Sequence, residues 1–206
     1  VGYEVEPQHS PLVYAYDRDG RRLFETPLAM DGASRVRLIS MAASRDGRFA
    51  FTGSAESSSG AWTYFIAFLD RAGRITRVNR LSGIRARHLC YGSDGTLWAA
   101  VESLKRGIPG RVVEPEHDIL QAYTPEGERK SSLLPRSSFA PAGEDWIRNP
   151  HPVFEDNFSR SQIAANDSEI VFLSLAFKQL VRVSRDGKVL SRVRVGRPTP
   201  DPDAMI

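Results

Sequence analysis

The chain has 206 residues, of which 41% are hydrophobic and 26% are charged, and this composition excludes intrinsic disorder as the default interpretation. The net charge of +3 arises from basic residues spread along the whole chain. Nucleic-acid binders concentrate such residues on one face or element, so we expect no nucleic-acid partner.

The sequence also limits the compartment and the redox chemistry. Every apolar run is far shorter than the ~18 residues needed to cross a bilayer, so we predict no membrane span. The chain starts at Val1 without a methionine or a signal-like segment, and its numbering is expected to begin inside a longer product. Its single cysteine, Cys90, excludes an internal disulfide and lies in an apolar stretch, which predicts a packing thiol.

One kind of turn recurs along the chain, in which an apolar strand is followed by a polar residue, two turn residues and a glycine. Asp17-Arg18-Asp19-Gly20 is its first copy. An Asp or Ser side chain can cap such a turn, and glycine accepts the positive φ that other residues resist. The four copies with their preceding strands occupy residues 14–20, 67–73, 121–127 and 181–187.

A second kind of turn alternates with the first, and it precedes strands that are almost wholly apolar. Its copies, with the strands that follow, span residues 44–51, 92–99 and, in degenerate form, 165–172. Continuous apolar runs such as 97–101 and 170–173 predict strands covered on both faces. The last strand of a unit alternates instead, as in 189–195, which predicts one packed and one solvated face.

Two doubly covered strands and a half-exposed outer strand describe a blade of a β-propeller, so we predict an all-β fold of four-stranded antiparallel blades. The predicted units are a partial blade at 1–33, blades at 34–83, 84–135 and 158–196, an inserted loop at 136–157 and a tail at 197–206. Together they form a single propeller domain or a fragment of one.

The pattern Ser-x-Asp-Gly followed by an apolar strand and an Asp-x-x-Gly turn resembles the NHL and TolB-like six-bladed propeller superfamily. The resemblance covers most of the chain outside 136–157 and concerns architecture, because these turns are structural. It implies six blades, more than 206 residues supply at ~40–50 residues a blade. It also favours a periplasmic or extracellular location.

Candidate binding residues occur where the repeat is interrupted. The segment from Trp146 to Asn157 combines an aromatic surface with polar groups between prolines, which is the composition of a ligand site; an ordered loop packed on the blades is the alternative. Arg37 and Arg85 each lie nine positions before the Asp of a second-type turn and could line an axial funnel that attracts anions. The predicted ligand-binding residues are Trp146, Arg148, Asn149, His151, Arg37 and Arg85.

These observations favour a non-catalytic module that binds a protein, a peptide or an anionic small ligand on one rim. The sequence contains no phosphate loop, zinc-ligand spacing or catalytic triad, so no cofactor is predicted. One alternative is a metal-dependent hydrolase of the lactonase type, whose family holds a divalent cation at the axis with Glu, Asn and Asp side chains. Its candidate ligands here are Glu102, Asn149, Asp156 and Asn157. A sensor-domain fragment of a larger regulator is a further alternative.

Overall fold

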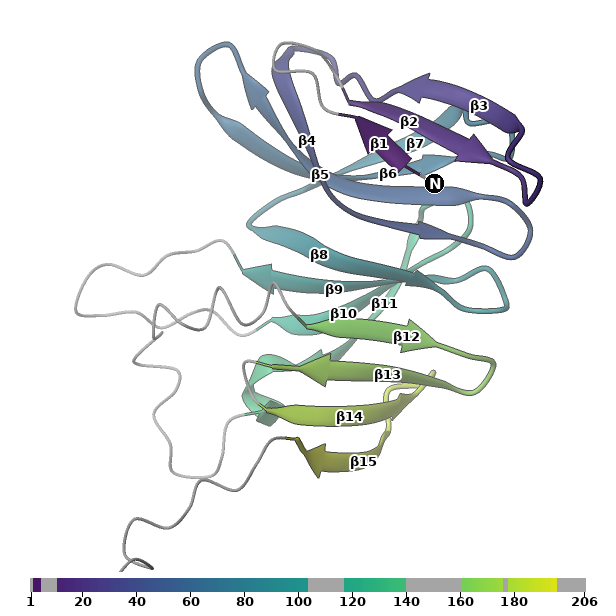
Figure 1. Cartoon of the computed structure of the whole chain (residues 1–206). Helices are drawn as coiled ribbons and strands as arrows, with labels where there is room; N and C mark the ends of the chain where they lie inside the picture. Colours follow the sequence, from purple (N-terminus) through teal and green to yellow (C-terminus); the bar gives the residue numbers. More distant parts are fainter. Residues whose placement is uncertain (1, 5–10, 104–116, 140–160, 176–177, 196–206) are drawn as a thin grey trace, which may run out of the picture.

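The computed structural model describes residues 2–4, 11–103, 117–139, 161–175 and 178–195, and it confirms an all-β chain (Figure 1). The strands form four antiparallel sheets, each made of consecutive strands. The first sheet has three strands, β1 (Gly2–Glu4), β2 (Leu12–Tyr16) and β3 (Arg22–Pro27). The second sheet has four, β4 (Ala33–Ala43), β5 (Phe49–Ser57), β6 (Trp62–Leu69) and β7 (Ile75–Leu81).

The third and fourth sheets repeat the order of the second. The third sheet contains β8 (Ile84–Tyr91), β9 (Leu97–Ser103), β10 (Asp118–Tyr123) and β11 (Arg129–Pro135). The fourth contains β12 (Gln162–Ala165), β13 (Glu169–Ser174), β14 (Gln179–Ser184) and β15 (Val189–Arg194). The first strand of the third sheet, β8, contacts the first strands of both neighbouring sheets, β4 and β12.

All the predicted glycine turns join antiparallel neighbours, as expected. The glycines have positive φ, and each backbone N–H donates back to the residue three positions before it, as Gly73 does to the Asp70 carbonyl at 3.0 Å. The Asp70 carboxylate also accepts hydrogen bonds from the N–H groups of Ala72 and Arg74, each at 2.9 Å, which closes the turn. The turns in question are those at Gly20, Gly47, Gly73, Gly95, Gly127 and Gly187.

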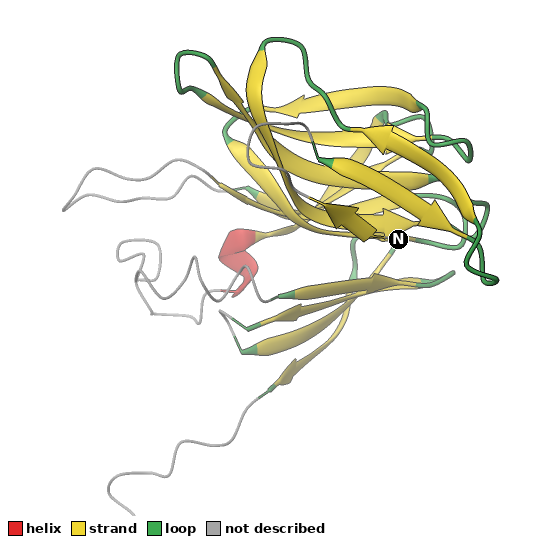
Figure 2. Ribbon diagram, turned by 45° about the horizontal axis from the view of Figure 1, so that its top comes forward, coloured by secondary structure: helices red, strands yellow, loops and turns green. Residues whose placement is uncertain are grey.

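These turns lie at one end of the stacked sheets, on the right in Figure 1, which we call the turn end. The opposite end, which we call the connection end, carries the β5–β6 turn, the start of β8 and the end of β9. A 3-10 helix, η1 (Arg136–Phe139), follows β11 there and is the red helix in Figure 2. It belongs to the segment predicted as an inserted loop, and its Phe139 ring meets Phe172 edge-on with centroids 6.0 Å apart.

Among the described residues the hydrophobic core forms three clusters, one at each junction between consecutive sheets. Phe24 and Phe51 belong to the cluster between the first and second sheets, and Ile66 and Leu97 to the cluster between the second and third. Trp98 and Phe172 lie in the cluster between the third and fourth sheets, and both are buried, as predicted.

The prediction of doubly covered strands is confirmed for β5 and β9 and wrong for β13. Nearly every side chain of β5 and β9 is buried, whereas burial alternates along β13, where Val171 and Leu173 remain half-exposed. The predicted packed face of β15 is also wrong, since Val193 is 52% exposed. The cause is the same in both cases: among the described residues no further sheet covers the outer face of the fourth sheet.

The described residues contain no helix long and apolar enough to cross a bilayer, which agrees with the sequence prediction.

Candidate functional site

The sequence-predicted Arg37 lies at the connection end of the second sheet, beside an aromatic ring. Register places Arg35 opposite Glu56 and Glu56 opposite Trp62, one row across β4, β5 and β6. The guanidinium carbons of Arg35 and Arg37 lie 5.3 and 5.1 Å from the Trp62 ring centroid, within the range of cation–π attraction. Arg35 also forms an ion pair with Glu56.

The backbone beside Arg37 is held by a close approach of two strands. The β4–β5 register shifts between Leu38 and Ser40, opposite Gly53. A Cβ atom at Gly53 would collide with the Arg37 carbonyl oxygen and would lie 2.7 Å from the Phe65 ring. Only glycine therefore allows β5 to approach β4 this closely, and the close approach sets the position of the Arg37 backbone.

The second predicted arginine, Arg85, lies on the neighbouring sheet and joins the same set of side chains. Its guanidinium carbon is 6.0 Å from the Tyr64 ring centroid, and Tyr64 follows Trp62 by two positions on β6. Arg85 and Arg87 both donate to Glu102, whose side chain is only 6% exposed. Burial alone would lower the pKa of Arg85, but its interactions with Glu102 and Tyr64 outweigh burial and raise that pKa.

We call this set the arginine–aromatic cluster. It consists of Arg35, Arg37, Arg85, Arg87, Trp62 and Tyr64, with Glu56 and Glu102. Four guanidinium groups and two carboxylates leave an excess of two positive charges. Within the described part of the chain Arg37 has no ion pair, and Trp62 is 39% exposed, so a cation and part of an aromatic side chain remain accessible to a ligand.

The sequence contained an unused signal for this cluster. Arg35-Val36-Arg37 and Arg85-Ala86-Arg87 are the same Arg-x-Arg pattern in two consecutive repeats, offset by two positions because Arg37 and Arg85 are the equivalent residues. Alternation along a strand puts both arginines of such a pattern on one face, unless a bulge intervenes. The pairing of these arginines with Trp62 and Tyr64 depends on cross-strand register, which composition does not reveal.

The other predicted site residues, Trp146, Arg148, Asn149 and His151, lie outside the described residues, as do Asn149, Asp156 and Asn157 of the lactonase alternative. The remaining candidate metal ligand, Glu102, is occupied by two guanidinium groups. Across the described ranges, no three His, Cys, Asp or Glu side chains gather in a way that could hold a metal ion.

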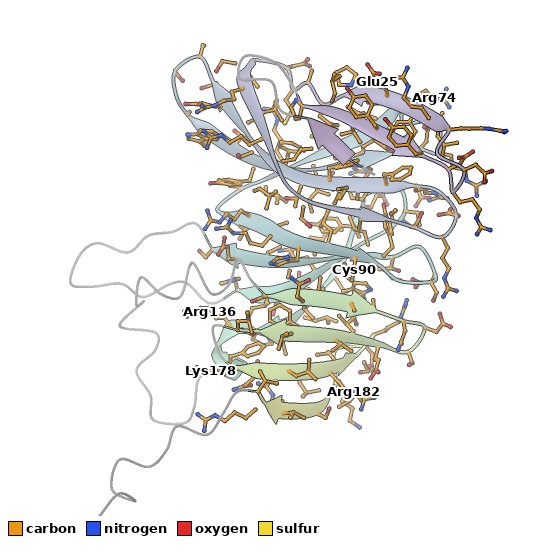
Figure 3. The ribbon with its side chains drawn as sticks, in the orientation of Figure 1. Glu25, Arg74, Cys90, Arg136, Lys178 and Arg182 are labelled. Carbon is orange, nitrogen blue, oxygen red and sulfur yellow. The ribbon has the colours of Figure 1, made fainter. Side chains whose placement is uncertain are left out.

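Cys90 is positioned for packing. It lies against the cluster between the third and fourth sheets, and Figure 3 shows it within the stack, while Arg136 lies at the connection end. Burial raises the pKa of the Cys90 thiol to about 12, so the thiol stays protonated at neutral pH and is a poor nucleophile.

No family model matches the chain, and no curated protein matches it. Among solved structures the chain is similar to the crystal structure of a functionally unknown protein from Desulfotomaculum acetoxidans DSM 771. The two share 12% sequence identity with a TM-score of 0.35, and the match covers 94% of this chain and 72% of that one. A similarity of this size supports no assignment of family or function.

Proposed function

We propose that the chain is a non-catalytic binding module that recognises an anionic ligand, most simply an acidic peptide segment of a partner protein, at the connection end. The observation that carries the proposal is the arginine–aromatic cluster, with its excess of two positive charges and its exposed ring. Carboxylates suit guanidinium groups because the planar donors of arginine can bind both oxygens. The Trp62 ring adds apolar area beside them.

We further propose that the four sheets are blades of a β-propeller of the NHL and TolB-like kind. Three features support this. Consecutive sheets pack face to face, and each sheet is a meander of strands that are consecutive in the chain. In addition, β8 lies between β4 and β12, as neighbouring inner strands do in a propeller. In such a ring the arginine–aromatic cluster would lie on the rim near the axis, where ligands meet several blades. The predicted contribution of Trp146, Arg148, Asn149 and His151 belongs to this proposal.

Binding of a dye-labelled hexaglutamate peptide, measured by fluorescence anisotropy at low and high salt, tests the proposal. The wild type should bind saturably and more weakly at high salt. Arg37→Gln should weaken binding by about two- to five-fold, the effect of one exposed charge. The matched control is Arg21→Gln, which removes another exposed arginine, from the β2–β3 turn at the turn end.

Trp62→Leu should weaken binding while leaving its salt dependence unchanged, because it removes the ring and no charge. Trp146→Ala tests the loop in the same assay. Absence of saturable binding, or an equal loss in Arg37→Gln and Arg21→Gln, would contradict the proposal. A stoichiometric divalent metal in the purified protein would support the lactonase-type alternative in its place.

A further inference from the structure

A cavity at the turn end, away from the arginine–aromatic cluster, lies where three equivalent turns meet. Its volume is about 150 Å³. The turns are those that follow β4, β8 and β12, the first strands of the second, third and fourth sheets, which lie side by side. The lining residues come from corresponding positions in the three repeats: Ala43 and Arg45, Tyr91 and Ser93, and Ala165 and Asp167.

The cavity has room for a ligand because two of the three strand ends carry alanine. Ala43, Tyr91 and Ala165 are the final residues of β4, β8 and β12. A second large side chain, in place of Ala43 or Ala165, would occupy the space that the methyl groups leave open. A cavity of roughly this volume accepts a molecule the size of a six-membered ring.

One positive and one negative side chain at this cavity differ from the other charged residues on the same turns, because they have no ion-pair partner among the described residues. Asp46 pairs with Arg48 at 3.1 Å, and Asp94 pairs with Arg185. Arg45 and Asp167 both line the cavity and are exposed, and neither forms an ion pair with another described residue. The cavity therefore presents one uncompensated guanidinium and one uncompensated carboxylate.

We propose that this cavity binds a small zwitterion that carries one ammonium and one carboxylate group, such as a free amino acid. Arg45 binds the ligand carboxylate through its planar donors, and Asp167 accepts hydrogen bonds from the ligand ammonium. A ligand with both charges compensates both side chains at once, whereas an anion or a cation alone compensates only one. The site goes beyond the proposed function, since it uses another end of the molecule and different residues.

The test measures chemical-shift changes in ¹⁵N-labelled protein on titration with glycine, β-alanine and 4-aminobutyrate, which separate the two charges by increasing distances. Acetate and ethylammonium are the single-charge probes. At least one zwitterion should bind about ten-fold more tightly than either single-charge probe, the effect of one further charged hydrogen bond. The shifted signals should come from the three turns.

Three variants locate the site. Arg45→Gln and Asp167→Asn should each weaken zwitterion binding by about ten-fold; only the first should affect acetate and only the second ethylammonium. Ala43→Phe should block all the probes while both charges remain. Arg21→Gln and Asp19→Asn in the β2–β3 turn are the charge-matched controls, because the first sheet does not line the cavity.

The proposal is overturned if no zwitterion gives saturable chemical-shift changes at concentrations up to about 50 mM. That concentration is well above the dissociation constant expected for a ligand of this size. It is also overturned if acetate binds as tightly as every zwitterion, if Ala43→Phe still binds, or if the control variants lose affinity equally. Hexaglutamate binding at the connection end is a separate measurement, so either proposal can fail alone.

Discussion

Strands β9 and β13 occupy the same position in neighbouring sheets and have similarly apolar sequences, yet they are buried differently. On β9 both faces are covered, with Leu97 packed toward the second sheet and Trp98 toward the fourth. On β13 Phe172 is buried and Leu173 is half-exposed. Burial of a second face is therefore a property of a sheet's place in the stack, because only an interior sheet has neighbours on both sides.

The turn glycines show a different dependence on position, in which only the first sheet differs from the other three. A Cβ atom at Gly73 would lie against the Phe24 ring of the first sheet, and one at Gly127 would lie 2.9 Å from the Phe68 ring of the second. At Gly187 it would lie 2.8 Å from Leu133 of the third sheet. At Gly20, in the first sheet, it would meet nothing within 4 Å. In the second, third and fourth sheets, the turn glycine therefore lies against the preceding sheet.

The largest effects on stability are expected from truncating side chains on β9 and β13. Trp98→Ala and Phe172→Ala should each lower the free energy of unfolding by ~3–5 kcal/mol, and Leu97→Ala by ~2–5 kcal/mol. Leu173→Ala deletes the same side chain from the outer face of the fourth sheet and should cost only about 1 kcal/mol. Urea unfolding measures all four. A loss for Leu173→Ala as large as that for Leu97→Ala would show that this outer face is covered in solution.

A smaller effect separates packing from backbone strain at the turns. Gly20 and Gly73 have nearly equal φ, +80° and +78°, so alanine is equally strained at both. Gly20→Ala should cost about 1 kcal/mol, because strain of ~1–2 kcal/mol is partly offset by a stiffer unfolded chain. Gly73→Ala should cost a further ~1–3 kcal/mol for displacing Phe24. Equal melting temperatures for the two variants would contradict packing of this turn on the first sheet.

The smallest effect concerns the junction between the third and fourth sheets, which an ion pair crosses. Neutral hydrogen bonds cross the other two junctions: Thr26 donates to the Gly73 carbonyl at 2.7 Å, and Asn79 to the Gly127 carbonyl at 2.6 Å. Two longer ion pairs, Arg48–Glu126 at 3.6 Å and Arg77–Glu128 at 3.7 Å, also cross the junction between the second and third sheets. Burial alone would raise the pKa of Asp94, but hydrogen bonds from Arg185 and Thr96 outweigh it and lower that pKa to about 2.

Since the folded pKa of Asp94 lies below its ordinary value of 3.8, its stabilisation is complete above pH ~4 and is lost as the pH falls toward 2. The Asp94 side chain is 44% exposed, so the change should stay below about 1 kcal/mol. Unfolding free energies at pH 4.5 and pH 2.5 should differ less in Asp94→Asn than in the wild type. Asp19→Asn is the control, because the Asp19 carboxylate forms no ion pair with a described residue. If the unfolding free energies at the two pH values differ as much in Asp94→Asn as in the wild type, titration of Asp94 is not a cause of the pH dependence.

The candidate site was predictable only in part. Arg37 and Arg85 were found because equivalent positions in a repeat share a place in the fold, and both do lie at the connection end. Arg35, Arg87, Trp62 and Tyr64 were missed, since their meeting depends on the register of β4, β5 and β6 and on contact between two sheets. The turn-end cavity was missed for the same reason, because its three turns are far apart in sequence.

The sequence by itself determined the all-β class, the glycine turns and the strands they join. These features are local: a capping side chain and a glycine with positive φ close a hairpin whatever lies around it. Tertiary structure decided which strand faces are covered, which of the described arginines have a carboxylate partner and where three turns line an open cavity. Those outcomes depend on neighbours distant in the chain, and an apolar strand has the same sequence pattern with one neighbouring sheet or with two.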